Sequence, residues 1–160
     1  MSFLVAAPQG ELPFPPWAIP LFFVGIWLFV MFIISRVGGW STLAGYYRTD
    51  QPFFGTLFRF QSASLRAGTN YNGCLNFGAN TEGLYMVPML IFRGFHAPLF
   101  IPWSEIIARP IKYWKLFDYV ELRFQRAPGV PVRIKPRLAA KLAQASVERF
   151  RVAPAGSVGN

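Results

Sequence analysis

Residue types that build catalytic and metal sites are scarce in this 160-residue chain, which has one cysteine, one histidine and seven acidic residues. The single cysteine, Cys74, excludes an intrachain disulfide, and the single histidine, His96, excludes any site that needs two imidazoles. Asp118 and Glu121 are close in sequence but fall on opposite faces of one predicted strand. No glycine-rich phosphate motif precedes a predicted helix. We therefore expect no catalytic residue, no metal site and no cofactor.

The two reactive side chains have structural interpretations. Cys74 lies in a strand-like stretch, where a small buried apolar residue is expected. His96, between Phe95 and Ala97 in a predicted loop, is expected at a surface or an interface.

Charge is also scarce, because only 14% of the residues are charged, against about 25% in a typical soluble domain. Apolar residues make up 53%, and 17 residues are phenylalanine. This composition excludes global disorder and disfavours an ordinary soluble enzyme. It favours lipid contact or a large protein interface, and the net charge of +9 suits an anionic partner.

Residues 12–35 contain no charged side chain. The 19 residues from Trp17 to Ser35 predict a transmembrane helix, since a helix of that length spans about 30 Å of hydrocarbon. Trp17 and Trp40 flank this stretch as candidate interfacial anchors. A cleaved signal peptide is disfavoured because residues 1–16 carry no Lys or Arg and no small-residue cleavage site follows. A buried core helix is disfavoured by the length of the uncharged run.

The juxtamembrane segment, residues 36–55, begins with a helix break at Gly38-Gly39. Ser41 is expected to cap a short helix over residues 42–48. The aromatic face of this helix is expected either to lie in the membrane interface or to pack on the following domain. Residues 49–54 are predicted to be a linker. We expect residues 40–54 to be a main docking surface, with its contacts made by Trp40, Tyr46, Tyr47, Arg48, Phe53 and Phe54.

Beyond the linker the apolar pattern changes to period two, which predicts six or seven short antiparallel strands. In the first, residues 56–66, Phe58, Phe60, Ser62 and Ser64 are expected on one face. Pro88 in the stretch 84–90 indicates an edge strand or a bulge. Turns are expected at residues 80–83 and 127–129, and a helix from Pro136 to about Val152.

This order of elements resembles the pleckstrin-homology (PH) superfold, a bent antiparallel sandwich or partly open barrel capped by its last helix. The stretch Pro98-Leu99-Phe100-Ile101-Pro102-Trp103-Ser104-Glu105-Ile106 resembles a strand-and-turn motif of bacterial PH-like and GRAM-like membrane proteins. Further short matches are Gly38-Gly39-Trp40, Leu43-Ala44, Tyr47-Arg48 and Gly83-Leu84-Tyr85. Together they resemble small bacterial membrane proteins with one N-terminal transmembrane helix and a PH-like cytoplasmic domain. The resemblance implies a fold and a topology, and no reaction.

The expected fold class is therefore a membrane-anchored β (α+β) protein of the bacterial inner membrane. It has an exoplasmic segment (1–16), a transmembrane helix (17–35), a juxtamembrane helix and linker (36–55), a PH-like domain (56–152) and a C-terminal tail (153–160).

Basic residues suggest contact with anionic lipid. The candidates are Arg36, Arg109, Lys112, Lys115, Arg133, Lys135, Arg137 and Lys141. A solvated basic face is the alternative interpretation. PH domains that bind phosphoinositides carry a dense basic cluster between their first two strands, whereas here that loop has only Arg66. We expect neither a nucleic-acid partner nor a small-molecule substrate.

Two functional hypotheses follow. The first is a non-catalytic accessory subunit of a multi-subunit bacterial membrane complex, for example a respiratory or photosynthetic one, whose partners are other membrane-protein subunits and lipid. The alternative is a membrane-tethered module that binds a lipid headgroup or a peptide.

The basic residues predict the topology, because none precedes the apolar run and all 16 follow it. We expect the N-terminus to be exoplasmic and the C-terminal domain cytoplasmic. A green fluorescent protein fused to the C-terminus should fluoresce, and alkaline phosphatase fused there should be inactive. Activity of the phosphatase fusion alone would contradict this topology.

Overall fold

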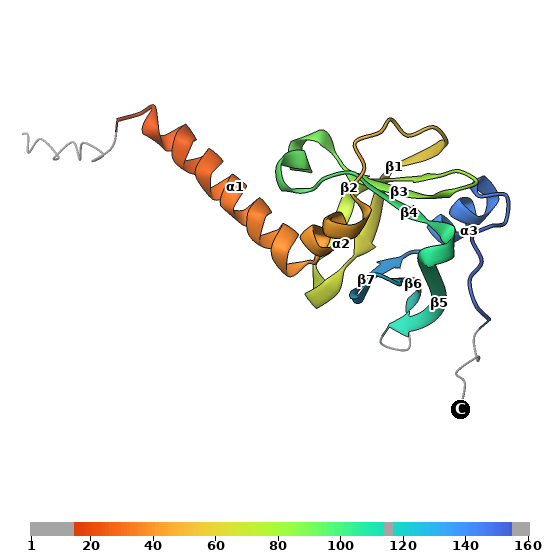
Figure 1. The fold of residues 1–160 in the computed structure, drawn as a ribbon. Helices are drawn as coiled ribbons and strands as arrows, with labels where there is room; N and C mark the ends of the chain where they lie inside the picture. The colour runs from red at the N-terminus through yellow and green to blue at the C-terminus, as the bar shows by residue number, and fades with distance from the viewer. Residues whose placement is uncertain (1–14, 114–116, 155–160) are drawn as a thin grey trace, which may run out of the picture.

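The computed structural model describes residues 15–113 and 117–154 (Figure 1). Two helices precede the sheet, α1 (Ala18–Val37) and α2 (Trp40–Tyr47), and a third, α3 (Pro136–Ala145), follows it. The strands are β1 (Thr56–Ser64), β2 (Asn70–Ala79), β3 (Gly83–Pro88), β4 (Leu99–Pro102), β5 (Ile106–Tyr113), β6 (Phe117–Phe124) and β7 (Ala127–Ile134). Short 3₁₀ segments are η1 (Arg66–Gly68), η2 (Leu90–Phe95) and η3 (Trp103–Glu105).

The strands form one open antiparallel sheet in the order β4-β3-β2-β1-β7-β6-β5. This confirms the predicted antiparallel strands, of which six or seven were expected, and the turn between β2 and β3. β1 pairs with β2 along its length but with β7 only at Ala63 and Ser64. Each edge strand is partly covered, β4 by a bridge to Arg48 and β5 by a bridge to Val152. Covered edges protect a sheet from pairing with other chains.

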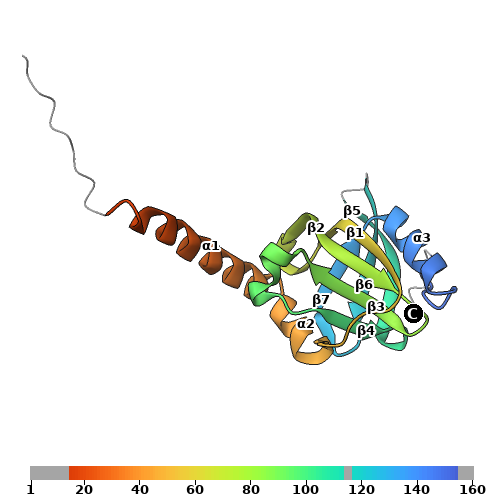
Figure 2. The same cartoon turned by 90° about the horizontal axis from the view of Figure 1, so that it is seen from above.

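Helices pack against both halves of the sheet and complete the core (Figure 2). The α2 helix contacts β4 and β7, and α3 contacts β2 and β6. Leu138 and Leu142 of α3 are buried, as are the inward residues Val120, Leu122 and Phe124 of β6. The alternation predicted for residues 117–125 is therefore confirmed.

The α2 helix lies in this core. Trp40 and Leu43 are fully buried, and Tyr47 is 4% exposed. The Trp40 indole N–H donates to the Ala97 carbonyl (3.0 Å), and the Tyr47 hydroxyl accepts from the Arg126 backbone N–H (3.2 Å). Of the two expected positions for this helix, the structure has the one packed on the domain. The prediction that Trp40 is an interfacial anchor is wrong, because Trp40 is buried in the core. The prediction that Ser41 caps the helix is also wrong, since the N-cap is Gly39.

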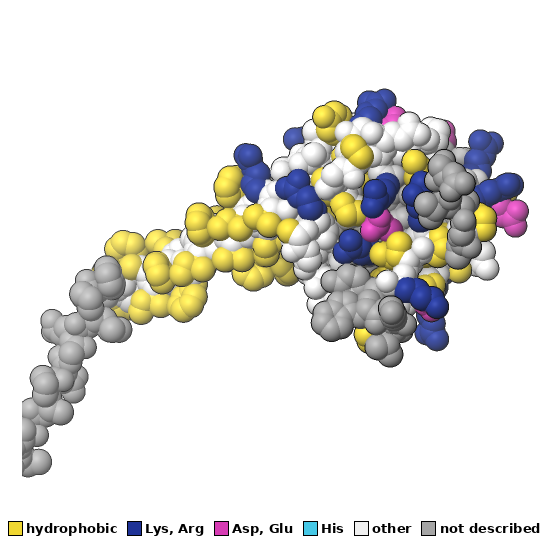
Figure 3. Space-filling model, turned by 90° about the horizontal axis from the view of Figure 1, so that it is seen from below, with side chains coloured by type: hydrophobic (Ala, Val, Ile, Leu, Met, Phe, Trp, Pro, Cys, Tyr) yellow, Lys and Arg dark blue, Asp and Glu magenta, His cyan; other side chains and the backbone are white. Residues whose placement is uncertain are grey.

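The α1 helix projects from the domain with most of its large apolar side chains exposed (Figures 1 and 3). Among the described residues it is the one helix long and apolar enough to cross a membrane. It runs from Ala18 to Val37, two residues beyond the predicted end.

Contacts at its C-terminal end fix α1 to the domain. Gly39 has φ +84°, and a Cβ there would lie 2.7 Å from Val130 Cγ2, so the turn after α1 requires glycine. The Arg66 guanidinium donates to the carbonyls of Val37 (3.3 Å) and Arg36 (3.4 Å) in the last turn of α1, where a cation is favourable. The Ser35 hydroxyl donates to the Phe95 carbonyl (2.7 Å).

Some local predictions are wrong. The turn expected at residues 127–129 lies at residues 125–126, because Ala127 already pairs with Phe124. β3 lies between β2 and β4, and Pro88 is tolerated because it ends the strand beyond the stretch paired with β4. The final helix ends at Ala145 instead of Val152, since Val147 (φ 53°) and Glu148 (φ 59°) are left-handed.

His96 is also buried, at 1% exposure, and is not a surface residue. Its Nε2 lies 2.9 Å from the Tyr71 hydroxyl, and burial lowers its pKa, with the Phe92 backbone acting in the opposite direction. Cys74 is half-buried and packs against the core.

The buried position of α2 predicts that Trp40→Ala destabilises the domain by about 3–5 kcal/mol, as large-to-small changes of core aromatics do. Tyr46→Ala, on the same helix but 54% exposed, is the matched control and should change stability by less than about 0.5 kcal/mol. Thermal unfolding of the detergent-solubilised full chain measures both. Equal transitions for the two variants would contradict the packing of α2.

Candidate functional site

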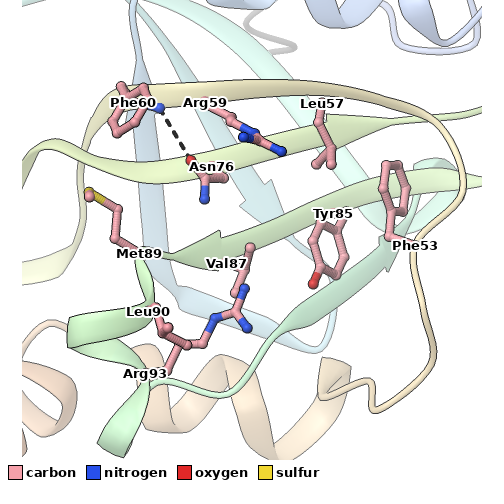
Figure 4. Close-up of a pocket in the computed structure, with 10 residues that line it drawn as sticks. All are labelled: Phe53, Leu57, Arg59, Phe60, Asn76, Tyr85, Val87, Met89, Leu90 and Arg93. Atoms are coloured by element: carbon pink, nitrogen blue, oxygen red, sulfur yellow. Dashed lines mark hydrogen bonds between the residues drawn. The ribbon is translucent and has the colours of Figure 1, made fainter.

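An open pocket of about 410 Å³ lies on the outer face of β1, β2 and β3, bounded at one end by η2 (Figure 4). Its walls come from five segments: the chain before β1, the three strands β1, β2 and β3, and the loop after β3. The lining residues are Phe53, Leu57, Arg59, Phe60, Asn76, Tyr85, Val87, Met89, Leu90 and Arg93.

A β-bulge in β1 turns Phe60 toward this pocket. Phe58 pairs with Phe77 and Gln61 with Leu75, so Arg59 and Phe60 together oppose the single residue Asn76. Phe60 has φ 56°, and its backbone N–H donates to the Asn76 Oδ1 (3.2 Å). Phe60 therefore lies on the outer face, 64% exposed, and the expectation that it shares a face with Phe58 is wrong.

Phe53 forms the opposite wall. Its ring stacks on Tyr85 with centroids 4.7 Å apart and an interplanar angle of 10°. Gly78, the cross-strand partner of Tyr85, leaves room for this ring, since a Cβ at Gly78 would lie 2.5 Å from Phe53 Cε1. The ring therefore covers a strand glycine that has no side chain to pack.

Two arginines bring positive charge into the pocket. Arg59 extends from β1 and Arg93 from η2, on the same side of the sheet (Figure 4). The Arg93 Nε donates to the Pro88 carbonyl at 3.5 Å, which holds the guanidinium over β3. Among the residues that the structure describes, no carboxylate lines the pocket. Guanidinium groups without a neighbouring carboxylate favour an anion that accepts several hydrogen bonds, such as a phosphate.

Neutral hydrogen-bonding groups lie between the two arginines. Burial raises the pKa of Tyr85, and the positive charge of Arg93 opposes this rise only in part, so the hydroxyl stays protonated at neutral pH. Asn76 places its side-chain amide in the same pocket, with its oxygen already used by Phe60. The site thus offers donors and aromatic surface for binding, and its lining contains no histidine, cysteine or carboxylate for acid–base or nucleophilic chemistry.

The structure separates the residues predicted as a docking surface. Trp40 and Tyr47 lie in the core, so these two side chains cannot form an exposed contact, and this part of the prediction is wrong. Phe53 is half-buried in the pocket wall. The exposed members are Tyr46, Arg48, which pairs with Asp50 at 3.4 Å, and Phe54, which is 79% exposed.

The basic residues predicted for lipid contact are also dispersed, over α1, β5, β7 and α3. Arg36, at the end of α1, lies over the Phe32 ring (5.1 Å). Arg109 and Lys112 on β5, and Arg137 and Lys141 on α3, are exposed, but both elements lie at the end of the domain away from α1 (Figures 1 and 2). Lys135 is exposed just before α3, and Lys115 lies outside the described residues.

Arg133 belongs to an ion-paired cluster. It contacts Glu121 at 3.1 Å, and Arg123 contacts the same carboxylate at 2.7 Å. Burial would raise the pKa of Glu121, but the hydrogen bonds and charges of the two arginines lower it below its ordinary value. Glu121 therefore neutralises one of the two guanidinium charges, and the three side chains together keep a net positive charge.

Arg59 and Arg93 were not singled out as candidates by the sequence. Arg93 carries a weak signal, since it is the lone charge within the apolar run of residues 84–95. Among the described residues, no group of three or more His, Cys, Asp or Glu side chains lies together to hold a metal ion.

No protein-family model, curated protein or solved structure matches this chain.

The Phe53–Tyr85 stack makes a prediction about Gly78. In Gly78→Ala the new methyl group displaces the Phe53 ring, so we expect loss of the stack and a destabilisation on the order of 1 kcal/mol. Gly45→Ala is the control, because a Cβ at this position meets nothing within 4 Å. This change replaces a glycine within a helix by alanine, which should stabilise the protein by up to about 1 kcal/mol. Near-ultraviolet circular dichroism and thermal unfolding measure the two effects. An unchanged aromatic spectrum in Gly78→Ala would contradict the arrangement.

Proposed function

We propose that this protein is a membrane-tethered, non-catalytic module that binds a phosphate-bearing lipid headgroup between Arg59 and Arg93. In this proposal α1 spans the bacterial inner membrane, and a PH-like domain lies on the cytoplasmic side. The observation that carries the proposal is the position of the pocket: its rim is η2, and η2 packs directly on α1.

The contact between η2 and α1 supports a location of the pocket beside the bilayer. The Phe92 ring lies 5.6 Å from that of Trp27, and the Phe95 ring lies 5.6 Å from that of Phe32. Leu90 and Arg93 of the same η2 segment line the pocket. A lipid in the leaflet that surrounds α1 can therefore present its headgroup to the pocket without leaving the membrane.

The charge distribution supports an anionic ligand. Two guanidinium groups, the Tyr85 hydroxyl and aromatic walls surround the pocket, and a charge-assisted hydrogen bond contributes about 1.5–3 kcal/mol. The PH-like assignment is supported by the sheet order and by the contact of α3 with both halves of the sheet.

The accessory-subunit hypothesis has less support from this geometry. It placed the docking surface on the transmembrane and juxtamembrane aromatics and the PH-like domain, and two of the six juxtamembrane contact residues are in the core. The remaining exposed side chains, Tyr46, Arg48 and Phe54, leave a smaller surface for a partner subunit.

Thermal unfolding of the full chain in a neutral detergent tests the proposal. Saturating dihexanoyl-phosphatidylglycerol should raise the midpoint by roughly 5–10 °C, and dihexanoyl-phosphatidylcholine should have little effect. Glycerol 1-phosphate is the third ligand, because comparison with it distinguishes binding of a lipid phosphate from binding of a soluble phosphate.

The variant Arg59→Gln/Arg93→Gln should abolish the stabilisation by the anionic lipid, with about a tenfold loss of affinity for each arginine. Arg109→Gln/Arg137→Gln removes the same charge from the far end of the domain and should keep it. Equal loss in both double variants would show that net charge, and not the pocket, binds the lipid. Equal stabilisation by glycerol 1-phosphate would instead indicate a soluble phosphate ligand.

A further inference from the structure

The η2 segment is an exposed apolar surface at an unusual place. Leu90 is 76% exposed, Ile91 65% and Phe95 42%, within the sequence Leu-Ile-Phe-Arg-Gly-Phe. Single exposed apolar residues are common, but a contiguous apolar loop marks a contact surface. The elements beside η2 indicate what this surface contacts.

The segment runs alongside the apolar part of α1. Phe95 contacts Phe32, and Phe92 contacts Trp27 farther up the helix, with ring centroids 5.6 Å apart in both pairs. Trp27 precedes Arg36 by nine residues, which is about 14 Å along a helix axis. If Arg36 marks the edge of the hydrocarbon, Phe92 therefore lies about halfway into a layer roughly 30 Å thick.

Several polar groups of the loop have hydrogen-bond partners within the protein. The Phe92 N–H donates to the Met89 carbonyl (2.9 Å), and the His96 N–H donates to the Arg93 carbonyl (3.2 Å). The Phe95 carbonyl accepts from Ser35, and the Arg93 side chain turns back to Pro88 and the pocket. Backbone at membrane depth requires such internal partners.

We propose that η2 is a membrane wedge that inserts Leu90, Ile91 and Phe92 among the lipid acyl chains of the leaflet on the domain side. The protein would then hold the bilayer at two places, α1 across it and η2 within one leaflet. This inference rests on the part of the proposed function in which α1 spans a membrane. It does not depend on the ligand of the pocket.

Depth measurements with a fluorescent probe on the full chain test the wedge. In a Cys74→Ser background, single cysteines at Ile91, Val24 and Ala140 are labelled with the NBD fluorophore and reconstituted into phosphatidylglycerol–phosphatidylcholine vesicles. Val24 is exposed on α1 and reports insertion of the helix, and Ala140 is exposed on α3 and reports the aqueous phase. Leu90→Cys is the second wedge position in case Ile91→Cys folds poorly.

The wedge predicts blue-shifted emission at Ile91, strong quenching by spin-labelled lipid and weak quenching by iodide, as at Val24. Ala140 should show the reverse. A lipid-quenched Val24 with an iodide-quenched Ile91 and Leu90 would overturn the wedge and leave the membrane span standing, and would assign η2 to a protein partner. Iodide quenching at Val24 as well would overturn the membrane span and the wedge together.

Discussion

Burial of α2 immediately after the Gly38-Gly39 turn is the constraint on which the rest of the arrangement depends. Trp40 is fully buried only three residues after α1 ends, so the apolar helix has no flexible tether to the domain. The turn itself allows no side chain at Gly39, because Val130 packs against it. Arg66 then satisfies the last carbonyls of α1 from the far side. The direction of α1 is therefore set by the domain core.

The positions of the pocket and of η2 both follow from that direction. Because α1 leaves the core beside the β3–β4 connection, η2 packs along it through Phe92 and Phe95. The same connection carries Arg93 into the pocket on the outer sheet face. A bulge at Phe60 and a glycine at Gly78 then shape the two walls. The bulge, the strand glycine and the η2 connection thus convert one face of an antiparallel sheet into a positively charged, aromatic pocket.

The sequence predicted the elements better than their contacts. The uncharged run located α1, and alternation in residues 117–125 located β6 with its inward residues. The amphipathic face of α2 had two physically equivalent explanations, and only the fold distinguishes lipid from core. The bulge at Phe60 leaves the alternating sequence pattern unchanged but moves the Phe60 side chain to the other face of the sheet. The chain after α3 adopts left-handed conformations at Val147 and Glu148, where no glycine in the sequence indicates the end of the helix.

The candidate site was the least predictable feature. Arg59 and Arg93 are separated by two strands and a loop, so nothing local in the sequence brings them together. The basic residues predicted for lipid contact lie at the end of α1 and on or beside β5, β7 and α3, and they do not include Arg59 or Arg93. The aromatic residues of the juxtamembrane segment predict a contact surface, but the side chains of Trp40 and Tyr47 make their contacts within the core of the domain.

The central claim is that α1 and the β domain form one rigid body. Double electron–electron resonance between spin labels at Leu21 on α1 and Ala140 on α3, in a Cys74→Ser background and in lipid nanodiscs, tests it most directly. The account predicts one narrow distance distribution. A broad distribution would mean that the domain moves freely on its helix, and it would contradict the account.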